Sequence, residues 1–283
     1  MIFGHAQMCH HAHGHFYLVQ NRVIMQLNFR DRLFRIWYWY VNKIDRKAEI
    51  LFMNYGFHSD EQENADDLIE TPDRFSIQLY DHLATAIDLK DLDVVEIGSG
   101  RGGGLYHVKR KHNPATALGI ELDSRAVRFC NTHYQDRGLA FSQGDAHSLK
   151  LGNETSDIVL NVESSHRYQD MPTFLSEAER VLRPGGHLLL TDFRYDHEMA
   201  DFKQILAKSG LQVVREKNIN REVLAALTLD DQRKRKLIKR LVPAFLHKVA
   251  LNFAGTIGST TYKNLESGKY VYFSYVLKKQ DLQ

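Results

Sequence analysis

Residues 94–104, VVEIGSGRGGG, constrain the fold of this chain more than any other segment. An apolar run ends there in a turn that has glycine at positions 98, 100 and 102. Glycine adopts positive φ angles without strain and lets the backbone approach a ligand with no Cβ in the way. The pattern is typical of a ligand-binding turn between a strand and a helix, but a glycine-rich loop alone does not identify the ligand.

Short apolar runs alternate with amphipathic stretches after residue 92. Apolar residues recur at helical spacing in 124–134 and 171–182, where we expect helices. Strands that alternate with helices predict a doubly wound, Rossmann-like α/β fold, with a parallel sheet covered on both faces. The expected strands are 93–97, 116–120, 139–143, 157–161 and 187–193, followed by two late strands at 211–219 and 269–279.

The chain is expected to hold one catalytic domain with added helical segments. Residues 1–90 are predicted to form a mostly helical N-terminal arm with a histidine-rich start, and 91–220 the ligand-binding core. Residues 221–283 are predicted to form a helical lid insert and the final strand of the sheet. Both helical segments place basic residues beside bulky apolar ones, in 30–52 and around 233–240, which suits a lid.

Charge and cysteine content restrict the class of protein. A formal net charge of +2 gives no argument for a nucleic-acid partner. Cys9 and Cys130 are too few and too far apart for a disulfide framework, which favours the cytoplasm. The sequence has neither an apolar run of about 18 residues nor a secretory signal pattern. The histidines near the N-terminus lack a pattern that completes a metal site, so no metal is expected.

Three carboxylates at the ends of successive strands indicate the ligand. Glu96 lies two residues before the glycine turn, where a negative charge is awkward for pyrophosphate but suits a cationic amino-acid group. Glu121 is placed to accept hydrogen bonds from ribose hydroxyls, and Asp145 from an adenine amino group. Gly103 completes a dinucleotide-type spacing, so spacing alone does not exclude a nicotinamide cofactor. The carboxylates favour S-adenosylmethionine.

The motifs of the core resemble those of class I S-adenosylmethionine-dependent methyltransferases. The resemblance covers residues 92 to about 195 and rests on VVEIGSGRGGG, GIELD, QGDAHSL, DIVLNVESSHRY and AERVLRPGGHLLLTDF, in that order. FMNYGF at 52–57, NVESSHRY at 161–168 and the tail that begins GSTTYKN resemble a narrower group. That group includes the phthiotriolone and phenolphthiotriolone dimycocerosates O-methyltransferases and implies a lipid or polyketide acceptor.

The resemblance implies roles for individual residues. Glu96, Gly98 and Gly100 are similar to residues that hold the methionine part of the cofactor. Tyr55 resembles a lid residue that closes over the cofactor, and Arg101 departs from the small or acidic residue often found at its position. The full set of expected cofactor contacts is Tyr55, Glu96, Gly98, Ser99, Gly100, Gly102, Glu121, Leu122, Asp145, Ala146, Asn161 and Val162.

The segment NVESSHRY leaves the fourth strand at the edge of the sheet where α/β folds bind ligands. Glu163 and His166 are three residues apart and face one pocket if a helical turn follows Asn161. His166 is the expected general base, and Glu163 is expected to orient its imidazole or to hold the acceptor hydroxyl. A purely pocket-shaping role for His166 stays open, since alignment alone accelerates transfer from a reactive donor.

A hydrophobic small molecule, lipid or polyketide is the expected acceptor, with O-methylation of a hydroxyl as the first choice. The basic amphipathic helices are expected to cover the pocket, and contact of these helices with an anionic membrane is compatible with that role. Three alternatives stay open: a sterol-type C-methyltransferase that uses Glu163, a nicotinamide-dependent oxidoreductase, and a methyltransferase fold that binds the cofactor without methylating. The oligomeric state is not predicted.

Overall fold

The computed structural model describes residues 45, 48–59 and 71–281. The chain divides into two compact units, residues 1–47 and 48–283, and the fold described below belongs to the second. Residues 48–90, assigned to the N-terminal arm from the sequence, lie in the same unit as the sheet. The histidine-rich start and most of the basic stretch at 30–52 lie outside the described residues.

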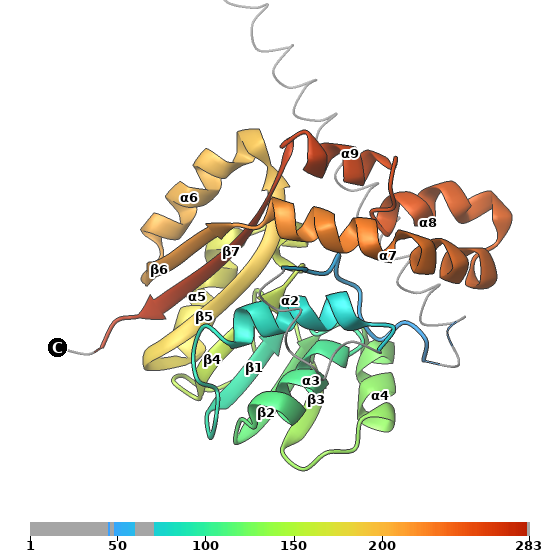
Figure 1. Cartoon of the computed structure of the whole chain (residues 1–283). Coiled ribbons are helices and arrows are strands. Elements are labelled where there is room, and N and C mark those ends of the chain that lie inside the picture. The colour runs from blue at the N-terminus through green and yellow to red at the C-terminus, as the bar shows by residue number, and fades with distance from the viewer. Residues whose placement is uncertain (1–44, 46–47, 60–70, 282–283) are drawn as a thin grey trace, which may run out of the picture. The chain divides into compact units, whose positions relative to one another are not determined.

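A seven-stranded mixed sheet forms the centre of this unit (Figure 1). Its strands are β1 (Asp93–Ile97), β2 (Thr116–Glu121), β3 (Leu139–Gln143), β4 (Ser156–Val162), β5 (Leu182–Tyr195), β6 (Leu211–Asn218) and β7 (Tyr270–Lys279). Their order across the sheet is β3-β2-β1-β4-β5-β7-β6. The pairs among β1 to β5 are parallel as expected, whereas β7 runs antiparallel to both of its neighbours, β5 and β6.

Strand β5 begins at Leu182, five residues earlier than the predicted start at 187. Ser156 of β4 pairs with Leu182, and the register then shifts before Ile158 pairs with His187. Gly185, at φ +78°, absorbs this irregularity within the LRPGG segment. The LRPGG segment is therefore the irregular start of β5.

Helices cover both faces of the sheet (Figure 1). The α-helices are α2 (Arg74–Ala84), α3 (Gly103–His112), α4 (Ser124–His133), α5 (Met171–Val181), α6 (Met199–Lys208), α7 (Asn220–Leu241), α8 (His247–Phe253) and α9 (Thr260–Glu266). Three short 3-10 helices are η3 (Ser165–Arg167), η4 (Asp196–Glu198) and η5 (Ala244–Leu246). No helix among the described residues has the length and apolar character that crossing a bilayer requires.

Side chains that alternate along the strands supply two cores. On β1, Val94 joins the core formed with α2, α3, α4, α7 and α9, whereas Val95 joins the core formed with α5 and α6. The side chain of Glu96 lies on the same face of the sheet as that of Val94, two residues earlier, and it contacts Tyr80 of α2. Helices α7, α8 and α9 contact one another, and they are the helices expected after residue 221.

Asp81 ties α2 to α3. Its Oδ1 contacts Nε2 of His107 at 2.8 Å and Nε2 of His112 at 3.1 Å, and its Oδ2 accepts from Nζ of Lys111 at 3.0 Å. Although burial acts in the opposite direction, these partners hold the pKa of Asp81 well below its usual range. A depressed folded pKa contributes stability that is present above the unfolded pKa of about 3.9 and is lost as the pH falls through the folded value.

We expect Asp81→Ala to lower the free energy of unfolding by about 2–4 kcal/mol near neutral pH, because three donors lose a buried acceptor. Urea denaturation of both proteins measures the difference, which should shrink as the pH falls below about 4. Asp201→Ala, at an exposed position on α6, is the control and should change stability much less. Equal stability of the Asp81 variant and the parent near neutral pH would contradict the prediction.

Candidate functional site

The turn after β1 has a backbone that glycine adopts most easily. Gly98, Gly100 and Gly102 have φ angles of +80°, +54° and +78°. A Cβ added to Gly98 would lie 2.0 Å from Oγ of Ser164, so a larger residue does not fit there. Around Gly100 the nearest atom is Cε of Met53, at 3.2 Å from a Cβ position. A Cβ at Gly100 would therefore meet only the end of one flexible side chain, and the backbone there takes a positive φ angle that favours glycine.

Glu96 is completely buried at the end of β1. The Tyr80 hydroxyl donates to its Oε1 at 2.7 Å, while Oε2 has no hydrogen-bond partner among the described residues. Burial raises the pKa of Glu96 to about 8 against the effect of the Tyr80 hydrogen bond. A buried carboxyl oxygen without a partner is costly, so this oxygen suits an incoming cationic donor.

Glu121 ends β2 beside the glycine turn. Its Oε2 accepts from the amide of Gly100 at 3.0 Å, and its Oε1 accepts from the amide of Asp123 at 2.9 Å. Burial raises the pKa of Glu121, although both amide hydrogen bonds oppose this shift. Leu122, the next residue, is 55% exposed. The structure thus brings the second predicted carboxylate into direct contact with the turn that follows Glu96.

Asp145 and Ala146 follow β3. The Asp145 side chain is 55% exposed, and its Oδ1 accepts from the amide of His147 at 2.9 Å and contacts Nδ1 of the same residue at 2.8 Å. Ala146 is buried. The ring of His147 lies 5.6 Å from that of Tyr168, so this loop reaches the segment that follows β4.

Asn161 is fully buried near the end of β4. Its Nδ2 donates to the carbonyl of Ile97 at 2.8 Å and to the hydroxyl of Tyr168 at 2.9 Å. Its Oδ1 has no hydrogen-bond partner among the described residues, and the same holds for Oγ of Ser99 in the glycine turn. Val162 is buried beside Asn161. With Glu96 Oε2, three buried polar atoms at the ends of β1 and β4 lack partners.

Glu163 connects three parts of the chain. It has φ +45°, and its Oε1 accepts from the amide of Tyr55 at 2.6 Å and from the hydroxyl of Tyr272 at 2.5 Å. Nζ of Lys234, on α7, donates to the carbonyl of Tyr55 at 3.3 Å. Burial raises the pKa of Glu163 to about 7 and lowers the pKa of Lys234 to about 8. Segment 48–59, α7 and β7 therefore meet at one carboxyl group.

His166 has a different carboxylate partner. Its Nδ1 lies 2.8 Å from Oδ1 of Asp192, and its amide donates to Oδ2 at 2.7 Å. The sequence predicted that Glu163 either orients this imidazole or holds the acceptor hydroxyl. In the structure Asp192 orients the imidazole, because Glu163 turns at positive φ toward Tyr55, and the second role stays a prediction. On the other ring nitrogen, Nε of Arg167 donates to Nε2 at 3.2 Å.

Asp192 is held rigidly beneath His166. It is completely buried and also accepts from the hydroxyl of Ser165 at 2.7 Å and from the amide of Phe193 at 2.8 Å. Although burial opposes it, the charge of Arg194 and the hydrogen bonds from His166 and Ser165 hold the pKa of Asp192 well below its usual range. Burial lowers the pKa of His166, against the effect of Asp192, so the imidazole is neutral near pH 7.

Sequence reasoning missed four residues of the site: Tyr80, Asp192, Lys234 and Tyr272. Asp192 had a visible signal, because an acid inside the apolar run HLLLTDF needs a buried partner. The other three come from segments that are distant in sequence, and they contact Glu96 or Tyr55 and Glu163 only after folding. No contact was predicted for Arg101. In the structure Cζ of its guanidinium lies 3.9 Å from the centre of the Phe129 ring.

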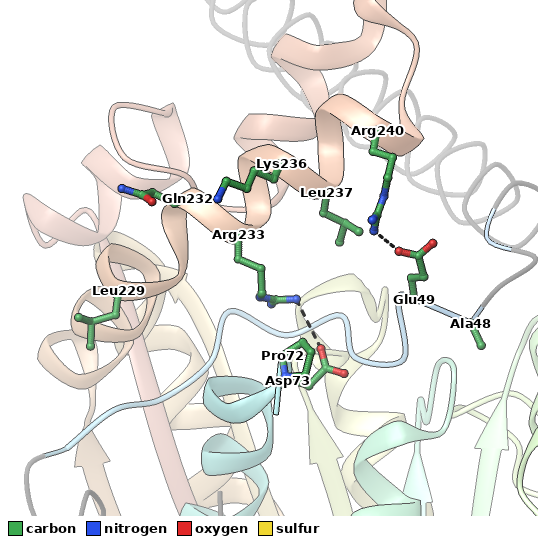
Figure 2. Close-up of a pocket in the computed structure, with 10 residues that line it drawn as sticks. All are labelled: Ala48, Glu49, Pro72, Asp73, Leu229, Gln232, Arg233, Lys236, Leu237 and Arg240. Carbon is green, nitrogen blue, oxygen red and sulfur yellow. Dashed lines mark hydrogen bonds and ion pairs between the residues drawn. The ribbon is translucent and has the colours of Figure 1, made fainter. Parts of the chain in front are cut away.

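A separate pocket of about 650 Å³ lies between α7 and the segments at 48–49 and 72–73 (Figure 2). Arg233 pairs with Asp73 across it at 3.6 Å, and Arg240 pairs with Glu49. None of the predicted cofactor or catalytic residues lines it. Its lining residues are Ala48, Glu49, Pro72, Asp73, Leu229, Gln232, Arg233, Lys236, Leu237 and Arg240.

The sequence of this chain is similar to a family model and to several other proteins. A family model described as a methyltransferase domain matches residues 95–190. The phthiotriol/phenolphthiotriol dimycocerosates methyltransferase of Mycobacterium leprae (strain TN) is 34% identical over 249 residues, which cover 88% of this chain and 92% of that protein. The chain belongs to this methyltransferase family. The fatty-acid O-methyltransferase of Mycolicibacterium smegmatis is 35% identical over 80% of this chain and 84% of that protein.

Solved structures of other proteins share the fold of this methyltransferase. The cyclase SpnF superposes with a TM-score of 0.64 at 15% identity, covering 86% of this chain and 92% of that one. A geranyl diphosphate methyltransferase in complex with SAM superposes with a TM-score of 0.59 at 15% identity. The match covers 81% of this chain and 99% of that one.

The resemblance to class I methyltransferases is thereby confirmed, and with it the Rossmann-like fold class. The enzyme is a methyltransferase whose cofactor is S-adenosylmethionine. A nicotinamide-dependent oxidoreductase is excluded.

Proposed function

We propose that this methyltransferase transfers a methyl group to a hydroxyl of a hydrophobic acceptor, with His166 as the general base. The contact between Nδ1 of His166 and Oδ1 of Asp192, at 2.8 Å, carries the proposal. A carboxylate on Nδ1 fixes the tautomer that leaves the lone pair on Nε2, and it stabilises the imidazolium that forms when a proton is taken up. Nε of Arg167 donates to this lone pair at 3.2 Å, so the proposal requires Arg167 to give way to the acceptor hydroxyl. This arrangement serves an acceptor that must lose a proton.

The described residues fit the cofactor. S-adenosylmethionine supplies a methyl group on a sulfonium, together with an ammonium group and an adenosine. We propose that Glu96 Oε2 and the glycine turn at Gly100 hold the methionine part, since Oε2 has no hydrogen-bond partner among the described residues and the turn at Gly100 lies beside it at positive φ. Glu121 is proposed for the ribose. The remaining predicted contacts are Tyr55, Gly98, Ser99, Gly102, Leu122, Asp145, Ala146, Asn161 and Val162, and they stay predictions.

Aromatic rings support a hydrophobic acceptor next to the base. Phe193 packs on the ring of His166 at 4.7 Å, and it also contacts Tyr55 at 5.6 Å and Tyr270 at 5.1 Å. These rings form an apolar wall that excludes water beside the base and keeps the proton transfer local. The named relatives agree with this proposal, because one acts on phthiotriol dimycocerosates and another on fatty acids.

The proposal is tested with methyl-labelled S-adenosylmethionine and three acceptors: a long-chain alcohol, the fatty acid of equal length and a sterol. We expect label in the methyl ether of the alcohol, identified by mass spectrometry. A product methylated at carbon would replace the proposal with the C-methyltransferase alternative, in which buried Glu163 takes the proton. Cofactor binding without any methylated product across a panel of hydroxyl acceptors would favour a non-methylating role. A cytoplasmic location stays a prediction from the sequence.

A further inference from the structure

The segment from the middle of α7 to α9 has a strongly asymmetric charge. Residues 232–265 contain no Asp or Glu, although they include seven lysine and arginine positions between 233 and 248. Several of these cations have internal partners, as Arg233 has in Asp230 and Arg235 has in Asp231. Lys236, Lys239 and Lys248 are exposed and form no ion pair among the described residues. Their charge is therefore directed to solvent.

Large apolar side chains are exposed in the same segment. Phe245, in η5, is 82% exposed, and Val249, in α8, is 51% exposed. The chain here turns tightly from α7 into α8, with Nε2 of His247 in contact with the carbonyl of Val242 at 2.8 Å. We name Lys236, Lys239, Phe245, Lys248 and Val249 the basic corner. An aromatic residue flanked in sequence by lysines, with no acid between residues 232 and 265, is the composition of a peripheral membrane contact.

We propose that the basic corner docks this methyltransferase on an anionic lipid bilayer. Lysines of the corner would lie at the level of the anionic headgroups, while Phe245 and Val249 enter the boundary with the acyl chains. The inference rests on the proposed hydrophobic acceptor, because a lipid that partitions into membranes must be collected there. It goes beyond that proposal by assigning the surface and the sign of the lipid charge.

The position of the corner supports this assignment. Lys236 belongs to the corner and also lines the pocket between α7 and segment 72–73 (Figure 2). Helix α7 also carries Lys234, whose Nζ contacts the carbonyl of Tyr55 at the candidate active site. One helix thus links the proposed bilayer contact, the pocket and the segment packed over Glu163.

Binding is measured by co-sedimentation of the full chain with vesicles of phosphatidylcholine, with and without phosphatidylglycerol, at low and high salt. We expect binding to anionic vesicles that weakens with salt. Phe245→Glu should lower the affinity for anionic vesicles at least about tenfold. The aromatic ring is lost from the interface, and the added negative charge is repelled by the anionic lipids. Val214→Glu is the matched control, because Val214 is 57% exposed on β6, and it should bind as the parent does.

Methyl transfer separates this inference from the proposed function. With the acceptor in detergent micelles, Phe245→Glu should be as active as the parent; with the acceptor in anionic vesicles it should be slower. Equal binding to neutral and anionic vesicles, no binding by the parent, or equal loss in Val214→Glu would overturn the inference. So would size-exclusion chromatography in which Phe245→Glu abolishes self-association while vesicle binding is unchanged. Failure of methyl transfer in micelles would instead count against the proposed function.

Discussion

Replacing His166 with asparagine is expected to lower kcat for methyl transfer to a hydroxyl acceptor by about 10²–10⁴-fold, the usual contribution of a general base. Asparagine keeps a hydrogen bond to Asp192 but cannot take up a proton. The affinity for S-adenosylmethionine should change little, since the three unpartnered polar atoms near the glycine turn belong to other residues. Single-turnover rates with a long-chain alcohol and equilibrium binding of the cofactor measure the two quantities.

A fatty acid is the matched control acceptor, because its carboxylate is already ionised near neutral pH and needs no base. His166→Asn should therefore slow the hydroxyl acceptor far more than the carboxylate. Asp192→Asn should act in the same direction, because it removes the charge that fixes the tautomer. Equal losses on both acceptors would reduce His166 to a residue that shapes the pocket.

The pH dependence of the parent enzyme follows from the same site. Burial lowers the pKa of His166, and a base is active in its neutral form, so kcat/KM for the hydroxyl acceptor, measured at saturating S-adenosylmethionine, should be flat near neutral pH. It should fall only on the acid side, below about 6.5, the ordinary value for histidine.

Replacing Glu96 with glutamine is expected to weaken binding of S-adenosylmethionine by about 10–100-fold, because a buried charge-assisted hydrogen bond to the ammonium group is lost. Burial raises the pKa of Glu96 to about 8, so the carboxyl is largely protonated near neutral pH before the cofactor binds. A cationic ligand favours the ionised form, and Glu96 should release its proton on binding. Isothermal titration in buffers of different ionisation enthalpy measures both the affinity and the released proton.

The pH dependence of cofactor affinity tests whether Glu96 releases a proton when S-adenosylmethionine binds. In the parent, cofactor affinity should rise with pH between about 5.5 and 7, by up to about tenfold per pH unit, while the ligand ammonium stays charged. Glu96→Gln should abolish this slope. Tyr80→Phe should keep the rise of affinity with pH but move it to higher pH. The Tyr80 hydrogen bond stabilises the carboxylate, and its loss raises the pKa of Glu96. A parent affinity that is independent of pH would refute the role proposed for Glu96.

The alternation of apolar runs and amphipathic stretches was enough to predict all seven strands and the glycine turn, since these depend on local pattern. The antiparallel placement of β7 was not predicted, because nothing in an aromatic-rich run at 269–279 distinguishes its direction in a sheet. The three-residue spacing of Glu163 and His166 predicted that both face one pocket, and it left open a contact between Glu163 and the imidazole. The positive φ of Glu163 turns the two side chains to different carboxyl and hydroxyl partners, and a backbone angle of this kind is not visible in sequence.

The placement of β7 also bears on the biogenesis of the enzyme. β7 forms hydrogen bonds with both β5 and β6, but it is synthesised after both of them and after α7, α8 and α9. Until β7 leaves the ribosome, the long edge of β5 is unpaired and open to pairing with other chains. Tyr272, which donates to Glu163, arrives with the same strand. The nascent polypeptide thus passes through a stage in which the glycine turn is already complete, yet the sheet is open and the site lacks one wall.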